Sequence, residues 1–144
     1  RDDELAARRY AQVLETDPRN PTALAALLSL LARADPQRAE AQLLQRLAQE
    51  PSAALYFALG NLYAGRGDWR AAQDAYFRAY EAQADNPDYA YNLAITLEHL
   101  GQPASALTYY RRAHESRRAK GHAGFEVASV EKRIDHLSSR ISQR

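Results

Sequence analysis

Apolar residues recur at steps of three and four along most of this chain, which is the spacing of one face of an α-helix. No segment sustains the alternation of apolar and polar residues that a half-buried strand needs, so the sequence predicts no β-strand. A capping residue stands directly before a proline at Asn20-Pro21, Asp35-Pro36 and Asn86-Pro87, and such pairs are typical of helix starts. The pattern predicts eight helices, over residues 3–16, 21–33, 36–49, 53–65, 69–83, 87–100, 103–119 and 125–141.

Two stretches of the chain, 59–81 and 93–115, carry the same residue types at a constant offset. A period of about 34 residues is typical of a helix–turn–helix unit that stacks on copies of itself, and the short connections predict antiparallel neighbours. Such a stack offers a long concave face to another molecule and encloses no active site by default. The matching pairs are Leu59 and Leu93, Gly67 and Gly101, Ala72 and Ala106, Tyr76 and Tyr110, Arg78 and Arg112, Ala79 and Ala113, and Glu81 and Glu115.

Residues 53–120 resemble tetratricopeptide repeats, whose first helix carries the pattern Trp-x-x-Leu-Gly-x-x-Tyr. The matching residues are Tyr56-x-x-Leu59-Gly60-x-x-Tyr63 in the first helix and Ala72-x-x-x-Tyr76-x-x-Ala79 in its partner. The glycine and the alanines are small enough to let two helices approach closely, and the tyrosines fill the adjoining space. In the next unit Ala94 and Leu97 replace the glycine and the tyrosine of the first helix, which preserves the small-then-large order.

Upstream of residue 53 the resemblance is less even. The segment Ala6-x-x-x-Tyr10 and the turn that follows it look like the second half of a repeat, over 3–20, without its first helix. Residues 21–52 look like a shortened repeat, with Arg46 where the family usually has a small residue. The resemblance implies one all-α domain over 1–144, which forms a right-handed superhelix of about three and a half antiparallel helix pairs. Two full repeats, over 53–86 and 87–120, follow the half repeat and the shortened repeat.

The last predicted helix, over 125–141, does not follow the repeat. Its apolar residues form one stripe, and its other face is charged. This pattern predicts a helix that caps the end of the stack, since an uncovered end exposes apolar surface. A dimerisation or partner-binding helix is the alternative interpretation. The stripe consists of Val127, Val130, Ile134, Leu137 and Ile141, and the charged face of Glu131, Lys132, Asp135 and Arg140.

Composition narrows the classes of function. The chain has 46% hydrophobic residues, enough for a core, and no cysteine, which excludes disulfides, thiolate metal sites and cysteine catalysis. None of the four histidines forms a pair at helical spacing, and no glycine-rich phosphate loop or nucleophile elbow is present. We therefore expect no metal, no cofactor and no catalytic activity. No apolar run approaches the roughly 18 residues of a membrane span.

The chain begins at Arg1, contains no methionine, and its first repeat lacks a first helix. We therefore expect a fragment of a longer protein or a product of N-terminal processing, which leaves room for a signal or anchor before Arg1. The sequence does not choose between a cytoplasmic and a periplasmic location, and it does not give the oligomeric state.

The resemblance implies that the first helix of each repeat lines the concave face. On this basis we expect a protein or peptide partner to bind a groove formed by Phe57, Asn61, Asp88, Tyr91, Asn92, Ile95 and His99. The unit over 53–86 has Ala58 and Ala64 at further groove positions. In the shortened unit the matching positions hold Thr22, Ala25, Ala26, Ser29 and Arg33. Rings and aliphatic side chains bury a peptide's side chains, and amides can bond its backbone. The alternative is that the two rings pack between repeats and the amides face water.

Charge is unevenly distributed although the net charge is only +1. Residues 111–144 carry nine lysines and arginines against four acidic residues. The basic cluster at 111–120 suggests binding of nucleic acid or of an anionic surface as the alternative function, whereas interleaved acidic residues and helix-end positions favour a solvated surface. The alanine- and arginine-rich composition and the run Leu55–Tyr63 also resemble bacterial repeat proteins of cell-envelope machines, such as type IV pilus and secretion assembly factors.

Overall fold

The computed structural model describes residues 2–143, which form eight α-helices and no strand. The helices are α1 (Asp2–Thr16), α2 (Pro21–Ala34), α3 (Pro36–Gln49), α4 (Ala53–Gly65), α5 (Trp69–Ala82), α6 (Pro87–His99), α7 (Pro103–Lys120) and α8 (Val127–Ser142). Every bound lies close to the predicted one, and the largest difference is at α8, which begins at Val127 rather than at 125. The all-α prediction is confirmed for the described part of the chain.

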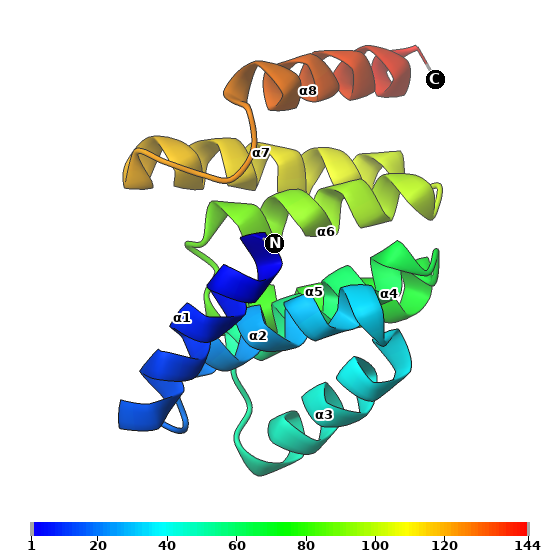
Figure 1. Cartoon of the computed structure of the whole chain (residues 1–144). Coiled ribbons are helices and arrows are strands. Elements are labelled where there is room, and N and C mark those ends of the chain that lie inside the picture. The colour runs from blue at the N-terminus through cyan, green and yellow to red at the C-terminus, as the bar shows by residue number, and fades with distance from the viewer. Residues whose placement is uncertain (1, 144) are drawn as a thin grey trace.

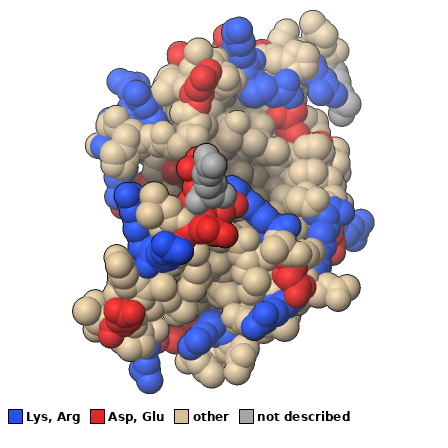
Figure 2. Space-filling view, in the orientation of Figure 1, with Lys and Arg blue, Asp and Glu red and all other residues tan. Residues whose placement is uncertain are grey.

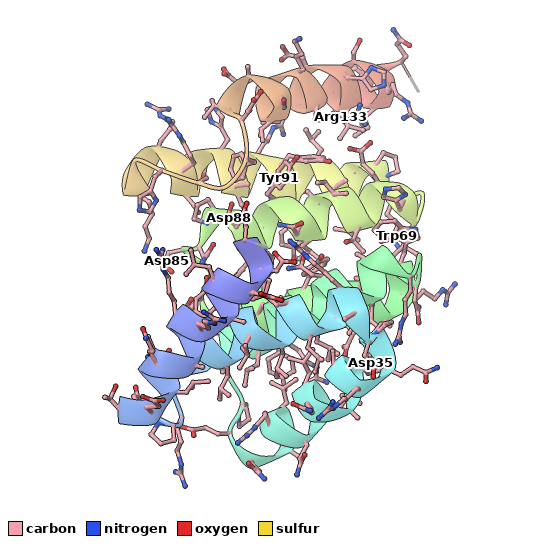
Figure 3. The ribbon with its side chains drawn as sticks, in the orientation of Figure 1. Asp35, Trp69, Asp85, Asp88, Tyr91 and Arg133 are labelled. Carbon is pink, nitrogen blue, oxygen red and sulfur yellow. The ribbon has the colours of Figure 1, made fainter. Side chains whose placement is uncertain are left out.

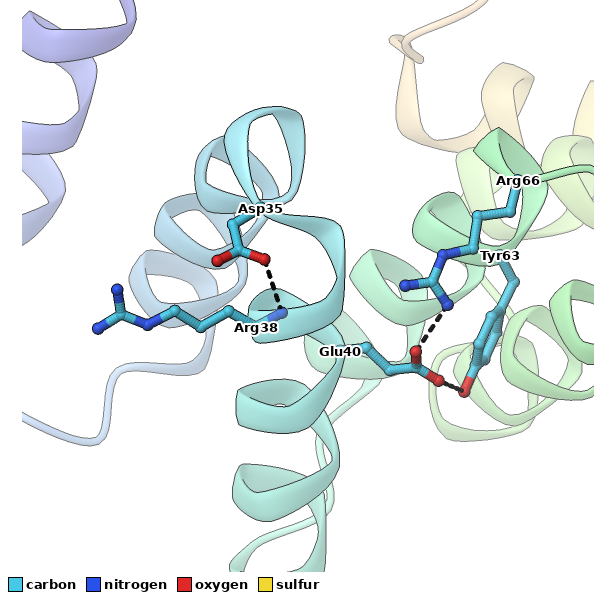
Figure 4. Close-up of polar contacts among 5 residues, drawn as sticks. All are labelled: Asp35, Arg38, Glu40, Tyr63 and Arg66. Carbon is cyan, nitrogen blue, oxygen red and sulfur yellow. Dashed lines mark hydrogen bonds and ion pairs between the residues drawn. The ribbon is translucent and has the colours of Figure 1, made fainter.

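The predicted capping residues set these bounds. The side chain of Asn20 accepts a hydrogen bond from the N–H of Ala23 at 2.9 Å, and Asp35 accepts one from the N–H of Arg38 at 3.1 Å (Figure 4). Asn86, Ser52 and Asp68 cap α6, α4 and α5 in the same way. Gln102 makes no side-chain cap bond, although proline still follows it. Capping satisfies N–H groups that have no partner inside the helix.

Each helix packs against the next one along the chain, so the molecule grows by stacking (Figure 1). The second helix of a pair contacts both its own first helix and the first helix of the following pair, as α5 contacts α4 and α6. In addition, the two first helices α2 and α4 pack against each other. This is the arrangement of a helical-repeat solenoid. The division into repeats at 21–52, 53–86 and 87–120 stays a prediction.

Small residues bring the helices of each pair close together. A Cβ added to Gly60 on α4 would lie 2.5 Å from a ring carbon of Tyr76 on α5, a distance that real Cβ atoms do not reach. Ala72 and Ala79 on α5 are fully buried, as are their counterparts Ala106 and Ala113 on α7. The small positions of the repeat therefore have the packing role that the sequence assigned to them.

A polar network ties α3 to the end of α4 (Figure 4). The hydroxyl of Tyr63 donates to Glu40 at 2.9 Å, and the guanidinium of Arg66 donates to the other carboxylate oxygen at 2.6 Å. The hydrogen bond from Arg66 lowers the pKa of Glu40, which burial alone would raise. The shortened unit is thus fastened to the next one by charge-assisted bonds as well as by apolar contacts.

The two ends of the stack differ. On α8, Val130 and Leu137 are fully buried, whereas Glu131, Lys132 and Asp135 are exposed. On α1 no residue is buried, and Val13 is 41% exposed. Val13 stands where α5 and α7 have the fully buried Ala79 and Ala113, because within the described residues no helix precedes α1 to cover that face.

Candidate functional site

The first helices α2 and α4 pack against each other, and Phe57 of α4 contacts Tyr89 of α6. We call the surface that α2, α4 and α6 present the first-helix face. It is hollowed between α2 and α4 by a cavity of about 440 Å³. Residues expected at the groove supply much of its lining, namely Ser29 and Arg33 from α2 and Ala58 and Asn61 from α4. The sequence did not single out the rest of the lining, Ala32, Pro36, Leu62, Gly65 and Arg66. The sequence indicated this cavity through one feature, the recurrence of groove positions in the shortened unit and in the unit over 53–86.

Of the predicted residues on α4, Asn61 is exposed and Phe57 is half buried. The side-chain oxygen of Asn61 accepts the hydroxyl of Tyr76 at 2.6 Å, which leaves its Nδ2 group to donate into the cavity. The ring of Phe57 lies 4.9 Å from Tyr89 on α6 and 5.7 Å from Tyr76, measured between ring centroids. Phe57 therefore fills the junction between two successive units, and Asn61 faces the hollow.

Three predicted residues near the start of α6 are engaged by the chain itself. Residues 121–126, the α7–α8 connection, run past this part of α6 (Figure 3). The N–H of Gly124 donates to Asp88 at 2.7 Å, and the ring of Phe125 stacks on Tyr91 with centroids 4.5 Å apart. Asn92 donates its amide to the carbonyl of Asp88 at 2.8 Å. Nothing in the repeat pattern indicated that this connection would cover α6.

The other two predicted residues, Ile95 and His99, lie together at the end of α6. With Glu98 and Arg133 they line a shallow hollow between α6 and α8. His99 is exposed and stacks on Trp69 of α5, with ring centroids 3.7 Å apart. The seven predicted residues are thus separated in the structure. Asn61 faces the hollow between α2 and α4, and Phe57 fills the junction between α4 and α6. Asp88, Tyr91 and Asn92 lie at the covered start of α6, and Ile95 and His99 lie beside α8.

Glu98 anchors α8 beside this hollow. Arg133 of α8 donates two hydrogen bonds to its carboxylate, one from Nε at 3.0 Å, and Tyr110 of α7 donates a third at 2.7 Å. Burial raises the pKa of Glu98, but the bonds from Arg133 and Tyr110 outweigh it and hold this pKa below its usual value. A carboxylate that is held ionised by two partners serves packing rather than proton transfer.

The basic cluster at 111–120 is largely engaged within the chain. Arg112 donates to the hydroxyl of Tyr80 at 3.2 Å and lies over the ring of Tyr109, and Arg111 donates to Ser138 at 3.3 Å. Lys120 pairs with Asp85 at 2.9 Å. Figure 2 shows basic and acidic side chains interspersed over the visible face, which is also hollowed near its centre. These contacts favour a structural role over a continuous phosphate-binding surface.

The described residues hold no group of three or more His, Asp or Glu side chains placed to bind a metal ion. Within residues 2–143 no helix is long and apolar enough to cross a membrane. No buried side-chain nitrogen or oxygen among them lacks a hydrogen-bond partner. The buried polar groups of this part of the chain are therefore satisfied by the fold itself, and the hollow between α2 and α4 is the open feature that coincides with the expected groove.

No family model and no curated protein sequence matches the chain. Solved structures do resemble it. MamA aligns with a TM-score of 0.61 and 22% identity over 99% of this chain and 92% of its own. YrrB, described as "a TPR protein with an unusual peptide-binding site", aligns with a TM-score of 0.74 and 22% identity over 95% of this chain and 68% of its own.

BtubC from P. vanneervenii aligns with a TM-score of 0.70 and 22% identity over 96% of this chain and 64% of its own. At such identities the likeness establishes the fold alone. Together with the motif in α4 and α5 and the stacking of helix pairs, it shows that this chain has the fold of a tetratricopeptide-repeat protein.

Proposed function

We propose that this chain is a non-catalytic scaffold that binds a peptide or protein segment on its first-helix face. The observation that carries the proposal is the cavity of about 440 Å³ in which two adjacent first helices, α2 and α4, bring together residues of the expected groove. Concave faces of this kind hold partners in repeat proteins. The likeness to YrrB, which is described as having a peptide-binding site, supports the same class of function.

The lining suits a short extended segment. Ala32, Ala58 and Leu62 provide an apolar floor, and Asn61 presents an amide that can donate to a backbone carbonyl. Arg66 is paired with Glu40 and Arg33 with Asp3, so the two arginines of the lining carry little uncompensated charge. The partner is therefore expected to be a peptide with small or apolar side chains facing this floor.

The remaining predicted residues extend the proposed site toward α8. Ile95 and His99 border a second hollow, so a longer segment that runs from α2 toward α8 meets both. Asp88, Tyr91 and Asn92 stay in the proposal as residues that shape the face. Their own contacts limit what they offer to a partner, because Gly124 and Phe125 already contact two of them.

Gly65 offers a clean test, because it lines the cavity and an added Cβ would meet no atom within 4 Å. Gly65→Phe should fill the cavity and leave the fold intact, whereas Gly65→Ala should leave the cavity open. Peptides selected against the whole chain from a displayed random library serve as probes. Their affinity should fall at least tenfold for Gly65→Phe and stay within twofold for Gly65→Ala.

The double variant Arg117→Ala, Arg118→Ala tests the alternative function through the basic cluster. It should leave peptide affinity unchanged. If it abolishes binding while Gly65→Phe has no effect, the basic surface is the binding site and the groove proposal is wrong. A cell-envelope assembly setting, in a pilus or secretion machine, stays a prediction that the identity of the captured peptides can test.

A further inference from the structure

A further cavity, of about 280 Å³, lies away from the groove at the far end of the shortened unit. It opens between the α1–α2 turn, the C-terminal end of α3 and the α3–α4 turn. Its apolar walls are Pro21, Leu24, Pro51 and Leu55, and two cations, Arg19 and Arg46, line it as well.

The cavity exists because the shortened unit departs from the repeat. Arg46 and Ala79 hold the same place on α3 and α5, since the carbonyl of each accepts the N–H of the residue that ends its helix, Glu50 and Gln83 respectively. In the unit over 53–86, Ala79 is fully buried against Ala53 and Tyr89, so no open space remains at this position. An arginine cannot enter such a contact, and α3 leaves open space beside it.

The two arginines that line this cavity, Arg19 and Arg46, have no ion-pair partner within residues 2–143. Only Glu50 contributes a negative charge to the lining. Guanidinium groups bind planar anions such as carboxylates through paired hydrogen bonds. The site therefore has a surplus of positive charge directly beside an aliphatic wall.

The volume of this cavity and its apolar lining indicate the chemical class of its ligand. A volume of about 280 Å³ lies at the lower limit of small-molecule sites and suits a buried group of about one amino-acid residue. An inorganic phosphate would leave the leucines and prolines against water, whereas a branched aliphatic group would cover them. The ligand chemistry that matches both features is a carboxylate attached to a short branched hydrocarbon.

We propose that Arg19 and Arg46 form an anion site that binds an aliphatic carboxylate, with its hydrocarbon part against Leu24 and Leu55. Two sources present this chemistry, a free branched-chain acid and the C-terminal residue of a polypeptide that ends in leucine. The site is independent of the groove between α2 and α4.

The test uses the full chain and three probes followed by NMR titration: 4-methylpentanoate, the peptide acetyl-Ala-Ala-Leu, and the same peptide with a C-terminal amide. The carboxylate forms should bind with dissociation constants on the order of 1 mM or below. Amidation should weaken binding at least tenfold. Binding by the acid alone identifies a small-molecule site, and tighter binding by the peptide identifies a chain terminus.

Variants connect binding to the named residues. Arg46→Ala restores the small residue of the other units, so it should fold at least as stably as the parent while losing carboxylate affinity at least tenfold. Arg19→Gln should lose affinity without filling the cavity. Arg38→Gln removes the same charge from α3 outside the cavity and should bind normally. Equal affinity for acid and amide, affinity unchanged by both arginine variants, or no binding up to about 10 mM would overturn the proposal.

Discussion

The ring of Tyr76 lies against the bare backbone of Gly60, so that a Cβ at position 60 would approach two ring carbons to 2.5 and 2.6 Å. Tyr76 cannot withdraw, because it is 2% exposed and its hydroxyl is bonded to Asn61. The contact fixes the distance between α4 and α5, and α4 supplies Ala58 and Leu62 to the floor of the groove.

Replacing Gly60 should therefore destabilise the fold. Gly60→Ala and Gly60→Leu should lower the free energy of unfolding by about 1–3 kcal/mol or more, with leucine the worse, because overpacking strains a closed contact. Urea unfolding followed by circular dichroism measures the effect. Gly65→Ala is the matched control and should gain about 0.5–1 kcal/mol, because the added methyl group meets open space and favours the helix. Equal behaviour of the two glycines would show that the repeat register is wrong.

The bonds to Glu98 make part of the stability depend on pH. Its pKa in the folded chain lies below the ordinary value of 4.5, so its stabilising contribution is present above about pH 4.5 and is lost as pH falls through the folded-state pKa. Glu98→Gln should be less stable than the parent at neutral pH. The gap between the two unfolding free energies should shrink steadily below pH 4.5. A gap that stays constant from neutral pH to acid would mean that the carboxylate charge contributes nothing.

The hydroxyl of Tyr63 should ionise at a higher pH than an ordinary tyrosine. Burial, and then its hydrogen bond to Glu40, raise the pKa of Tyr63 to about 12 from the ordinary 10.0. Its bond to Glu40 therefore stabilises the fold below pH 10 and is lost as pH rises toward 12. An absorbance titration of the parent should show a late tyrosinate component, and Tyr63→Phe should remove one tyrosine from it. An unchanged late component in Tyr63→Phe would place the Tyr63 hydroxyl in water.

Removing α8 tests its capping role. Deleting residues 125–144 takes away the fully buried Val130 and Leu137 and uncovers the apolar cluster around Leu97 and Tyr110. The shortened chain should aggregate or dimerise in size-exclusion chromatography and should melt at a lower temperature. Deleting only 143–144 is the control. A truncated chain that stays monomeric and equally stable would show that the apolar stripe serves a partner instead.

Local signals account for what could be predicted about the fold. Asn20, Asp35 and Asn86 act on N–H groups that closely follow them along the chain, so their effect on a helix start is visible in the sequence itself. The pattern of small and large residues that resembles tetratricopeptide repeats similarly predicted that two helices approach closely at Gly60, with Tyr76 filling the adjoining space. These features need no knowledge of how distant parts of the chain meet.

The sequence did not predict that the start of α6 is covered, because this cover comes from the segment after residue 120, where the 34-residue repeat ends. The α7–α8 connection occupies residues 121–126, so α8 starts later than a strict repeat would place it. That shift carries Gly124 and Phe125 onto Asp88 and Tyr91, which lie far from them in the sequence. The sequence also marked Arg46 as irregular, but the open space beside it follows only from how α3 sits relative to α2 and α4.

The two ends of the solenoid are not equivalent as places to add a helix, because Val13 is exposed on α1 whereas α8 exposes charged side chains. A helix with the small and large positions of α4 would meet Ala6 and Tyr10 on α1 at the places of Ala72 and Tyr76 on α5, with Val13 in place of Ala79. At α8 the same helix would meet Glu131, Lys132 and Asp135, whose charges it would have to strip of water. To lengthen this protein, further units should therefore be added before α1, where the face around Val13 is uncovered, and α8 should stay at the C-terminal end of the stack.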